Sequence, residues 1–130
     1  MNKKIEIAQI YFESLAIGDI PTLFGLFSEN VVWHQPGNNK FSGVKKGVEA
    51  ISQMIVGMME LSSGTLKVEK AANFMENENL VVTPIIFSAT KGDSSIKMSG
   101  IDIFKIEKDK IVEVWLFSDD QIEEDNFWGK

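Results

Sequence analysis

Apolar residues in the first half of the chain recur at the three- and four-residue spacing of amphipathic helices. The stripe of a first helix, expected over residues 3–17, consists of Ile5, Ala8, Phe12 and Leu15. The stripe of a later helix, expected over residues 47–60, consists of Val48, Ile51, Ile55 and Met58. Between them Gly18 ends the first helix, and Asp19 can cap a short second helix that carries Pro21 in its first turn.

The second half of the chain is typical of a β-sheet. Long runs rich in β-branched and aromatic residues, separated by short polar turns, predict strands over residues 65–75, 80–90, 95–106 and 111–118. A further strand is expected over residues 31–35, before a loop around residues 41–43. Short turns between long strands indicate an antiparallel meander. Because the helices are segregated from these consecutive strands, we expect one α+β domain that spans residues 1–130.

Composition narrows the classes of function. The chain carries a net charge of -6 with scattered basic residues, whereas nucleic-acid binding requires a clustered basic face, so we expect no nucleic-acid partner. No stretch approaches the roughly 18 apolar residues of a membrane span, and polar residues interrupt the N-terminal segment where a signal peptide would be apolar. There is no cysteine, which excludes disulfides and thiolate metal sites and fits a reducing cytoplasm.

The strand expected over residues 95–106 places an acidic side chain among hydrocarbon. Alternation puts Asp102 on the same face as Met98 and Phe104. A carboxylate loses hydration there, so it must find a donor or stay protonated. A protonated Asp102 would donate a hydrogen bond into a pocket. The alternative is a structural aspartate bonded to a loop amide or to a basic side chain.

Tyr11 and His34, the only tyrosine and the only histidine of the chain, are two further candidates. Tyr11 lies on the buried side of the first helix, where its hydroxyl group needs a partner unless it reaches water. Histidine can act as acid or base near neutral pH, but His34 alternates with Trp33, so only one of the two can face a pocket. The alternative for His34 is a partly exposed position at a strand end. A lone histidine without cysteine gives little support for a metal site, and no metal or cofactor is expected.

The last strand adds one more candidate carboxylate. Alternation puts Ile111, Glu113, Trp115, Phe117 and Asp119 on one face. Asp119 could lie at the rim of a pocket, with Asp120 as the one-residue alternative. It could equally be a strand-end carboxylate in water.

The acidic tail over residues 119–130 carries two large aromatic residues, Phe127 and Trp128. A purely solvated tail rarely contains such side chains. We therefore expect these two residues to dock on the domain or on a second subunit.

Several of these segments, in their order and spacing, resemble the SnoaL-type polyketide cyclases of the nuclear transport factor two-like superfamily, which includes ketosteroid isomerase. The similarity runs from about Ile5 to Asp119. It is carried by Gly18-Asp19, residues 31–37, Ser42-Gly43, residues 101–104, residues 110–113 and Trp115. The resemblance implies a cystatin-like fold in which a cone-shaped, curved antiparallel or mixed sheet and three N-terminal helices enclose a pocket.

The resemblance also implies roles for individual residues. Tyr11 and Asp102 match the tyrosine and the protonated aspartate of the oxyanion hole in ketosteroid isomerase. Gln35 stands where that isomerase has its carboxylate base and cannot take a proton, so His34 would have to take over the role. Asp119 matches the acid–base aspartate of the cyclases. The pocket would be lined by Trp33, Gln35, Met98, Phe104, Trp115 and Phe117.

Three hypotheses follow for the function. The first is a cofactor-independent cyclase or isomerase that acts on an enolisable, apolar carbonyl compound. The second is a non-catalytic binder of an apolar small molecule in the same pocket. The third is an interaction module that forms a homodimer through the open face of the sheet. That face would be built from Val81, Ile85, Phe87, Ile101 and Ile103.

Overall fold

The computed structural model describes residues 2–130. The helices are α1 (Lys3–Ile17), α2 (Ile20–Gly25), α3 (Val48–Leu61) and α4 (Gln121–Trp128). The strands are β1 (Phe27–Gln35), β2 (Gly43–Lys46), β3 (Lys67–Lys70), β4 (Met75–Asn77), β5 (Leu80–Lys91), β6 (Ser94–Glu107) and β7 (Lys110–Ser118). All strands belong to one sheet with the order β2-β1-β7-β6-β5-β3, and β4 also pairs with β5.

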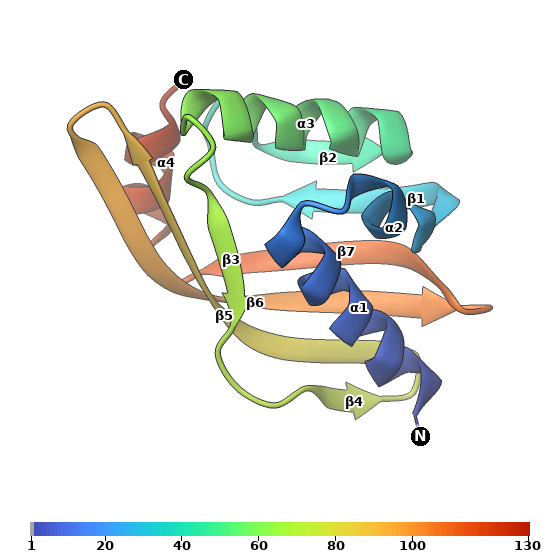
Figure 1. Cartoon of the computed structure of the whole chain (residues 1–130). Helices are drawn as coiled ribbons and strands as arrows, with labels where there is room; N and C mark the ends of the chain where they lie inside the picture. Colours follow the sequence, from blue (N-terminus) through green and yellow to red (C-terminus); the bar gives the residue numbers. More distant parts are fainter. Residues whose placement is uncertain (1) are drawn as a thin grey trace.

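Helices cover one face of this sheet (Figure 1). α3 packs against β1 and β2, and α1 packs against β3 and β5. β1 runs parallel to β7, whereas the neighbouring pairs in the rest of the sheet are antiparallel. The predicted α+β class with a mixed sheet is therefore confirmed, and a fourth helix is added at the C-terminal end. None of the helices within residues 2–130 combines the length and the apolar character needed to cross a bilayer.

Capping residues set the start of α1 and, as expected, its junction with α2. Asn2 caps α1, because its side-chain oxygen accepts a hydrogen bond from the backbone N–H of Lys4 at 3.0 Å. Gly18 ends α1 in the left-handed conformation, with φ of 72°. Asp19 then caps α2 by accepting from the backbone N–H of Thr22 at 3.2 Å. The chain thus turns sharply between α1 and α2.

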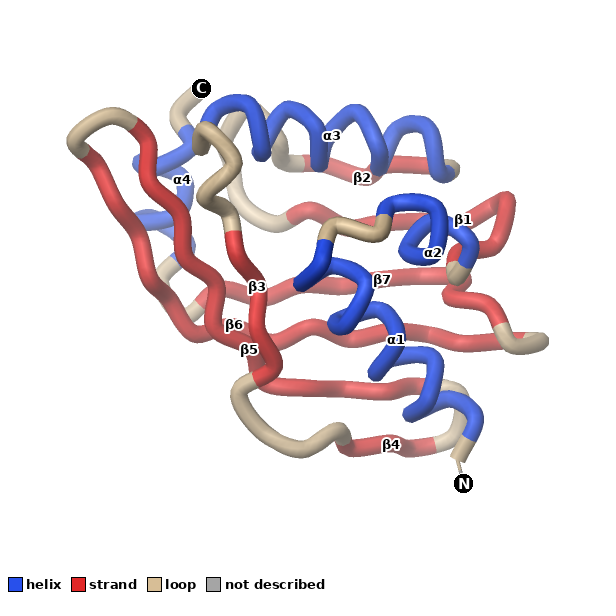
Figure 2. The backbone as a smooth tube through the Cα atoms, in the orientation of Figure 1, coloured by secondary structure: helices blue, strands red, loops and turns tan. Residues whose placement is uncertain are grey.

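The long β5–β6 hairpin gives the sheet its curvature. Its turn end bends away from the plane of the other strands and rises beside α4 (Figure 2). Gly100 of β6 allows β7 to approach closely, because an added Cβ atom would collide with the backbone oxygen of Phe117. The sheet therefore wraps around the side that carries the helices.

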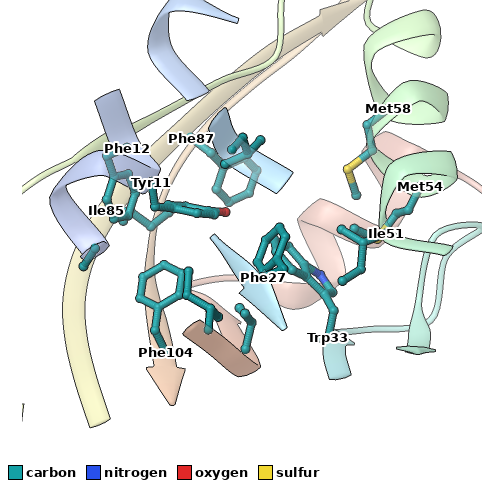
Figure 3. Packing of buried hydrophobic residues seen from close by; sticks show 14 of the residues in the cluster. Tyr11, Phe12, Phe27, Trp33, Ile51, Met54, Met58, Ile85, Phe87 and Phe104 are labelled. Atoms are coloured by element: carbon teal, nitrogen blue, oxygen red, sulfur yellow. The ribbon is translucent and has the colours of Figure 1, made fainter. Parts of the chain in front are cut away.

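Aromatic side chains dominate the core between α1 and the sheet. Figure 3 shows Tyr11 and Phe12 of α1 above Phe104 of β6, and the ring centroids of Tyr11 and Phe104 are 4.8 Å apart. All three side chains are buried. α1 is thus fixed to the sheet by edge-to-face aromatic contacts.

One prediction about the open face was wrong. Val81, Ile85 and Phe87 belong to the core, with exposed fractions of only 0%, 4% and 8%. Val81 pairs with Phe104, which fixes its side of β5 as the inner one. Ile101, by contrast, lies on the open face with 40% of its surface exposed.

The strand predicted over residues 65–75 is also corrected. The structure has two short strands there, β3 and β4, separated by residues 71–74. Ala71, Ala72 and Asn73 in this gap are poor strand formers. The loop expected around residues 41–43 leads directly into β2, a short edge strand that hydrophobic alternation does not reveal.

A β-bulge breaks the predicted alternation in β7. Lys105 pairs with Glu113, but Ile106 pairs with Ile111, so β7 contains one extra residue at this point. Ile111 therefore faces inward, as does Val114, whereas Glu113 and the residues that alternate with it face outward. The prediction that Trp115 shares a face with Ile111 was wrong for this reason.

The C-terminal tail docks on its own domain. The backbone N–H of Lys40 donates to the carbonyl oxygen of Gly129 at 2.8 Å. The ring of Trp128 meets the ring of Phe41 edge-on, with centroids 5.2 Å apart. Phe127 and Trp128 are 6% and 1% exposed. The expected docking of the two tail aromatics is confirmed, and it closes one end of the space between the helices and the sheet.

Candidate functional site

A cavity of about 90 Å³ lies between the inner face of the sheet and the helices α1, α3 and α4. Most of its lining is hydrocarbon, including Met54 and Met58 of α3. The cavity is smaller than the roughly 150 Å³ of an engineered apolar cavity that takes up benzene. Entry of a ring therefore requires side chains to move, and unbranched methionines do so readily.

Asp102 is the most deeply buried polar group of this lining. It lies in the middle of β6 with 2% of its surface exposed. Burial raises the pKa of its carboxyl group from the ordinary value of 3.8 to about 7, and no neighbouring donor or cation opposes this change. No fully enclosed polar side-chain atom within residues 2–130 lacks a partner. The unpaired carboxyl oxygens therefore reach the cavity rather than the packed core.

Tyr11 brings a second polar group to the cavity. Its side chain extends from α1, and Figure 3 shows its hydroxyl oxygen pointing away from Phe12 into the space beside Phe87. Burial raises the pKa of this phenol well above 10.0, and the nearby charge of Asp102 raises it further. Near neutral pH the pair thus presents a phenolic donor and a carboxyl group whose neutral form is populated.

Gln35 contributes a third donor from β1. The indole N–H of Trp33 donates to the Gln35 side-chain oxygen at 2.9 Å. Because an indole can only donate, this bond fixes the oxygen of the amide toward Trp33 and leaves the amide NH₂ group for the cavity. Gln35 is 8% exposed and lines the cavity.

Glu124 of α4 is the second carboxyl group of the lining. One of its oxygens accepts from the Ser118 hydroxyl at 2.6 Å and from the Gln121 amide at 3.0 Å. The other accepts from the indole N–H of Trp128 at 3.2 Å. Only 5% of the residue is exposed. The carboxyl group is thus held rigidly at the end of the cavity that α4 closes.

The structure places three of the predicted site residues outside the cavity. His34 and Trp115 lie on the outer face of the sheet, where their rings stack with centroids 5.5 Å apart. His34 also pairs with Glu113 at 2.6 Å. Of the two neighbouring residues Trp33 and His34, it is Trp33 that faces inward. Asp119 is exposed beyond the end of β7 and does not line the cavity.

Three further predicted wall residues occupy different positions around the cavity. Met98 and Phe104 face inward as expected, but both are packed into the core beside the cavity instead of lining it. Phe117 borders the cavity, although 56% of its surface is exposed because the bulge in β7 turns its side chain to the open face. The structure therefore brings together Tyr11, Trp33, Gln35 and Asp102, with Phe117 at the edge.

Glu124 was missed because the tail was not recognised as a helix. The signal was present in the sequence. Asp120 is followed three residues later by Glu123, and its side chain accepts from the backbone N–H of Glu123 at 3.1 Å. A helix that starts there puts Glu124 and Trp128 on one face at four-residue spacing.

The described residues contain no cluster of three or more histidine, cysteine or acidic side chains arranged to hold a metal ion. The polar groups of the cavity are hydrogen-bond donors and acceptors. Tyr11, Gln35 and the neutral form of Asp102 offer donors, and Glu124 offers an acceptor. An uncharged ligand with oxygen atoms at its ends would match this set.

Comparison with known proteins places the fold. The sequence matches the SnoaL-like domain family over residues 8–114. A search of curated proteins finds none that matches the chain. A protein of unknown function with a cystatin-like fold from Xanthomonas campestris is 42% identical, with a TM-score of 0.94 and 100% of both chains covered.

Two more distant structures share the architecture. Bal32a, from a soil-derived mobile gene cassette, is 24% identical with a TM-score of 0.92, and the match covers 97% of this chain and 96% of Bal32a. A candidate polyketide cyclase from Sinorhizobium meliloti is 18% identical with a TM-score of 0.69, covering 85% and 93% of the two chains. At these identities the likeness shows the fold alone.

The expected cystatin-like fold is confirmed by the Xanthomonas campestris protein. The family match begins within α1 and ends within β7, so it includes the strands and helices that build most of the cavity. The chain belongs to the SnoaL-like domain family.

Proposed function

We propose that the protein binds an apolar small molecule through a carbonyl group, with Tyr11 and Asp102 donating hydrogen bonds to the carbonyl oxygen. The observation that carries this proposal is a pair of buried, unpaired polar groups that open on a hydrocarbon-lined cavity. A buried polar group without a partner costs free energy. A carbonyl oxygen has two lone pairs and can accept from both groups at once.

Binding can be tested with acetophenone, using ethylbenzene as a probe of similar shape that lacks the carbonyl oxygen. Loss of one hydrogen-bond donor, in Tyr11→Phe, should weaken acetophenone binding by about tenfold and leave ethylbenzene unchanged. Asp102→Asn keeps a donor and should keep binding, whereas Asp102→Leu should lose it. Equal affinity of the wild-type protein for the two probes would contradict the proposal.

The same pair of donors supports a second candidate, catalysis of enolisation. Donors aimed at a carbonyl oxygen stabilise the negative charge that develops there when a proton passes from the neighbouring carbon to a base, which here would be a water molecule. Cyclisation or isomerisation of an enolisable carbonyl compound would use this step, and a structural neighbour is described as a candidate polyketide cyclase. His34 and Asp119, the bases suggested by the sequence, lie outside the cavity, so the simpler role is binding without catalysis.

Deuterium exchange separates catalysis from binding. In D₂O, an enolising protein should exchange the methyl protons of acetophenone faster than buffer does, and Asp102→Leu should abolish the acceleration. Proton NMR of the methyl signal measures the rate directly. A wild-type protein that binds acetophenone but leaves the exchange at the buffer rate is a binder only.

The open face of the sheet supports the proposal that the protein forms a homodimer. Val44, Ile101 and Phe117 are large apolar residues exposed on strands β2, β6 and β7 by 54%, 40% and 56%. Clustered exposure of this kind marks interaction surfaces. Phe117→Lys should convert the dimer to a monomer in light scattering, and Ile122→Lys, on the exposed side of α4, should not. A monomeric wild-type protein would contradict this proposal.

A further inference from the structure

The end of the cavity closed by α4 carries polar groups that carbonyl binding at Tyr11 and Asp102 does not use. Gln35 ends β1 and leads into Pro36 and Gly37, and an added Cβ atom at Gly37 would collide with the α4 side chains Gln121 and Asp125. Gly37 therefore lies against α4, the helix that carries Glu124, and Gln35 is two residues before Gly37 in the chain. Trp33 holds the amide oxygen of Gln35, and the amide NH₂ group has no hydrogen-bond partner among residues 2–130.

Glu124 supplies the complementary acceptor at this end. Three donors, Ser118, Gln121 and Trp128, hold its two oxygens. Two carboxylate oxygens offer about four lone-pair positions, so one acceptor position remains. Ser118 and Trp128 themselves line the cavity, which places the carboxyl group at the cavity wall.

We infer that Gln35 and Glu124 form a second recognition site, which binds a hydroxyl group at the far end of the ligand. A hydroxyl group both donates and accepts, so it can donate to Glu124 while it accepts from the Gln35 amide. This inference rests on the proposed carbonyl site, and it narrows the ligand to an apolar compound with a carbonyl group and a separate hydroxyl group.

The register of the sheet keeps the two sites apart. Asp102 pairs with Leu116 of β7, and Ser118, which donates to Glu124, is two residues further along that strand. Two residues of a strand span about 7 Å. One aromatic ring with oxygen substituents on opposite sides bridges such a separation, and hydrocarbon side chains line the cavity between the two sites.

A matched pair of ketones tests the inference. 4-Hydroxyacetophenone differs from acetophenone by one hydroxyl group at the end opposite the carbonyl group. Since a hydrogen bond to a charged group is among the strong ones, the wild-type protein should bind the hydroxylated ketone at least tenfold more tightly. Glu124→Gln should reduce this preference, taken as the ratio of the two affinities measured in the variant, at least threefold. Glu123→Gln makes the same charge change at an exposed position of α4 and should keep the preference.

NMR of the tryptophan indole N–H groups provides a second readout in the unmodified protein. The Trp128 indole donates to Glu124 and the Trp33 indole to Gln35. 4-Hydroxyacetophenone should shift both signals more than acetophenone does. If acetophenone binds but the added hydroxyl group changes neither affinity nor these signals, the second site is wrong and the carbonyl site stands. If neither ketone binds, both proposals fail.

Discussion

Replacing Asp102 by asparagine should make the protein more stable at neutral and alkaline pH. In the folded chain, burial raises the pKa of Asp102 to about 7, whereas the unfolded chain has the ordinary value of 3.8. Between pH 3.8 and about pH 7 the unfolded state therefore binds fewer protons than the folded state. The free energy of unfolding therefore falls as pH rises, and the contribution of Asp102 is intact only below the lower value.

The size of the effect follows from the difference between the pKa of Asp102 in the folded and the unfolded chain. A tenfold change in an acid dissociation constant corresponds to about 1.4 kcal/mol, so the raised pKa costs the folded protein on the order of 4 kcal/mol above pH 7. Asparagine has nearly the same shape and carries no charge at any of these pH values. The stability of Asp102→Asn relative to the wild type should thus increase by about 1.4 kcal/mol per pH unit between pH 4 and 7 and then level off.

Urea unfolding followed by tryptophan fluorescence at pH 4, 5, 6, 7 and 8 measures this difference. Asp93→Asn, in the exposed turn between β5 and β6, is the matched control and should show no such trend relative to the wild type. The comparison at each pH removes the contributions of the other acidic groups. A constant difference between Asp102→Asn and the wild type from pH 4 to 8 would refute the reasoning.

Three further substitutions have defined outcomes. Tyr11→Phe should change the free energy of unfolding by less than about 1 kcal/mol, because the hydroxyl group faces the cavity; a loss above about 2 kcal/mol in urea unfolding would show that it has a structural partner. Gly37→Ala should lower the free energy of unfolding by about 1–3 kcal/mol, because Gly37 has φ of 88° and its added Cβ atom would displace α4. Wild-type stability together with unchanged Trp128 indole signals would contradict this expectation. His34→Gln should lower the free energy of unfolding by less than about 1 kcal/mol, because the pair with Glu113 is partly exposed. The variant should also leave acetophenone binding unchanged, and a loss of binding would place His34 in the site.

Much of the fold was predictable from the sequence because α1, α3 and β6 each keep one period over their length. The alternation in β6 holds over its whole length, so the inward position of Asp102 among hydrocarbon followed directly from the spacing. Capping residues marked the turn between α1 and α2 in the same way. These features depend on neighbouring residues alone.

The rest depended on partners that are distant in the chain. The bulge in β7 exists only as a mismatch of register with β6, so the faces of Trp115 and Phe117 could not be read from β7 alone. Alternation in β1 allows either Trp33 or His34 to face inward. Packing of Trp33 in the core decides between them. Glu124 lines the cavity because α4 docks on the domain. The capping signal indicated the helix but not where it docks.

The central claim is that Asp102 presents a neutral carboxyl group to a ligand carbonyl. Carbon-13 NMR of the Asp102 carboxyl carbon between pH 3 and 9 tests it most directly. We predict a titration midpoint near pH 7, in line with the raised pKa, and a further rise when acetophenone is bound, because the ligand accepts a hydrogen bond from the protonated form. A midpoint near 3.8, or one that acetophenone leaves in place, would contradict the account.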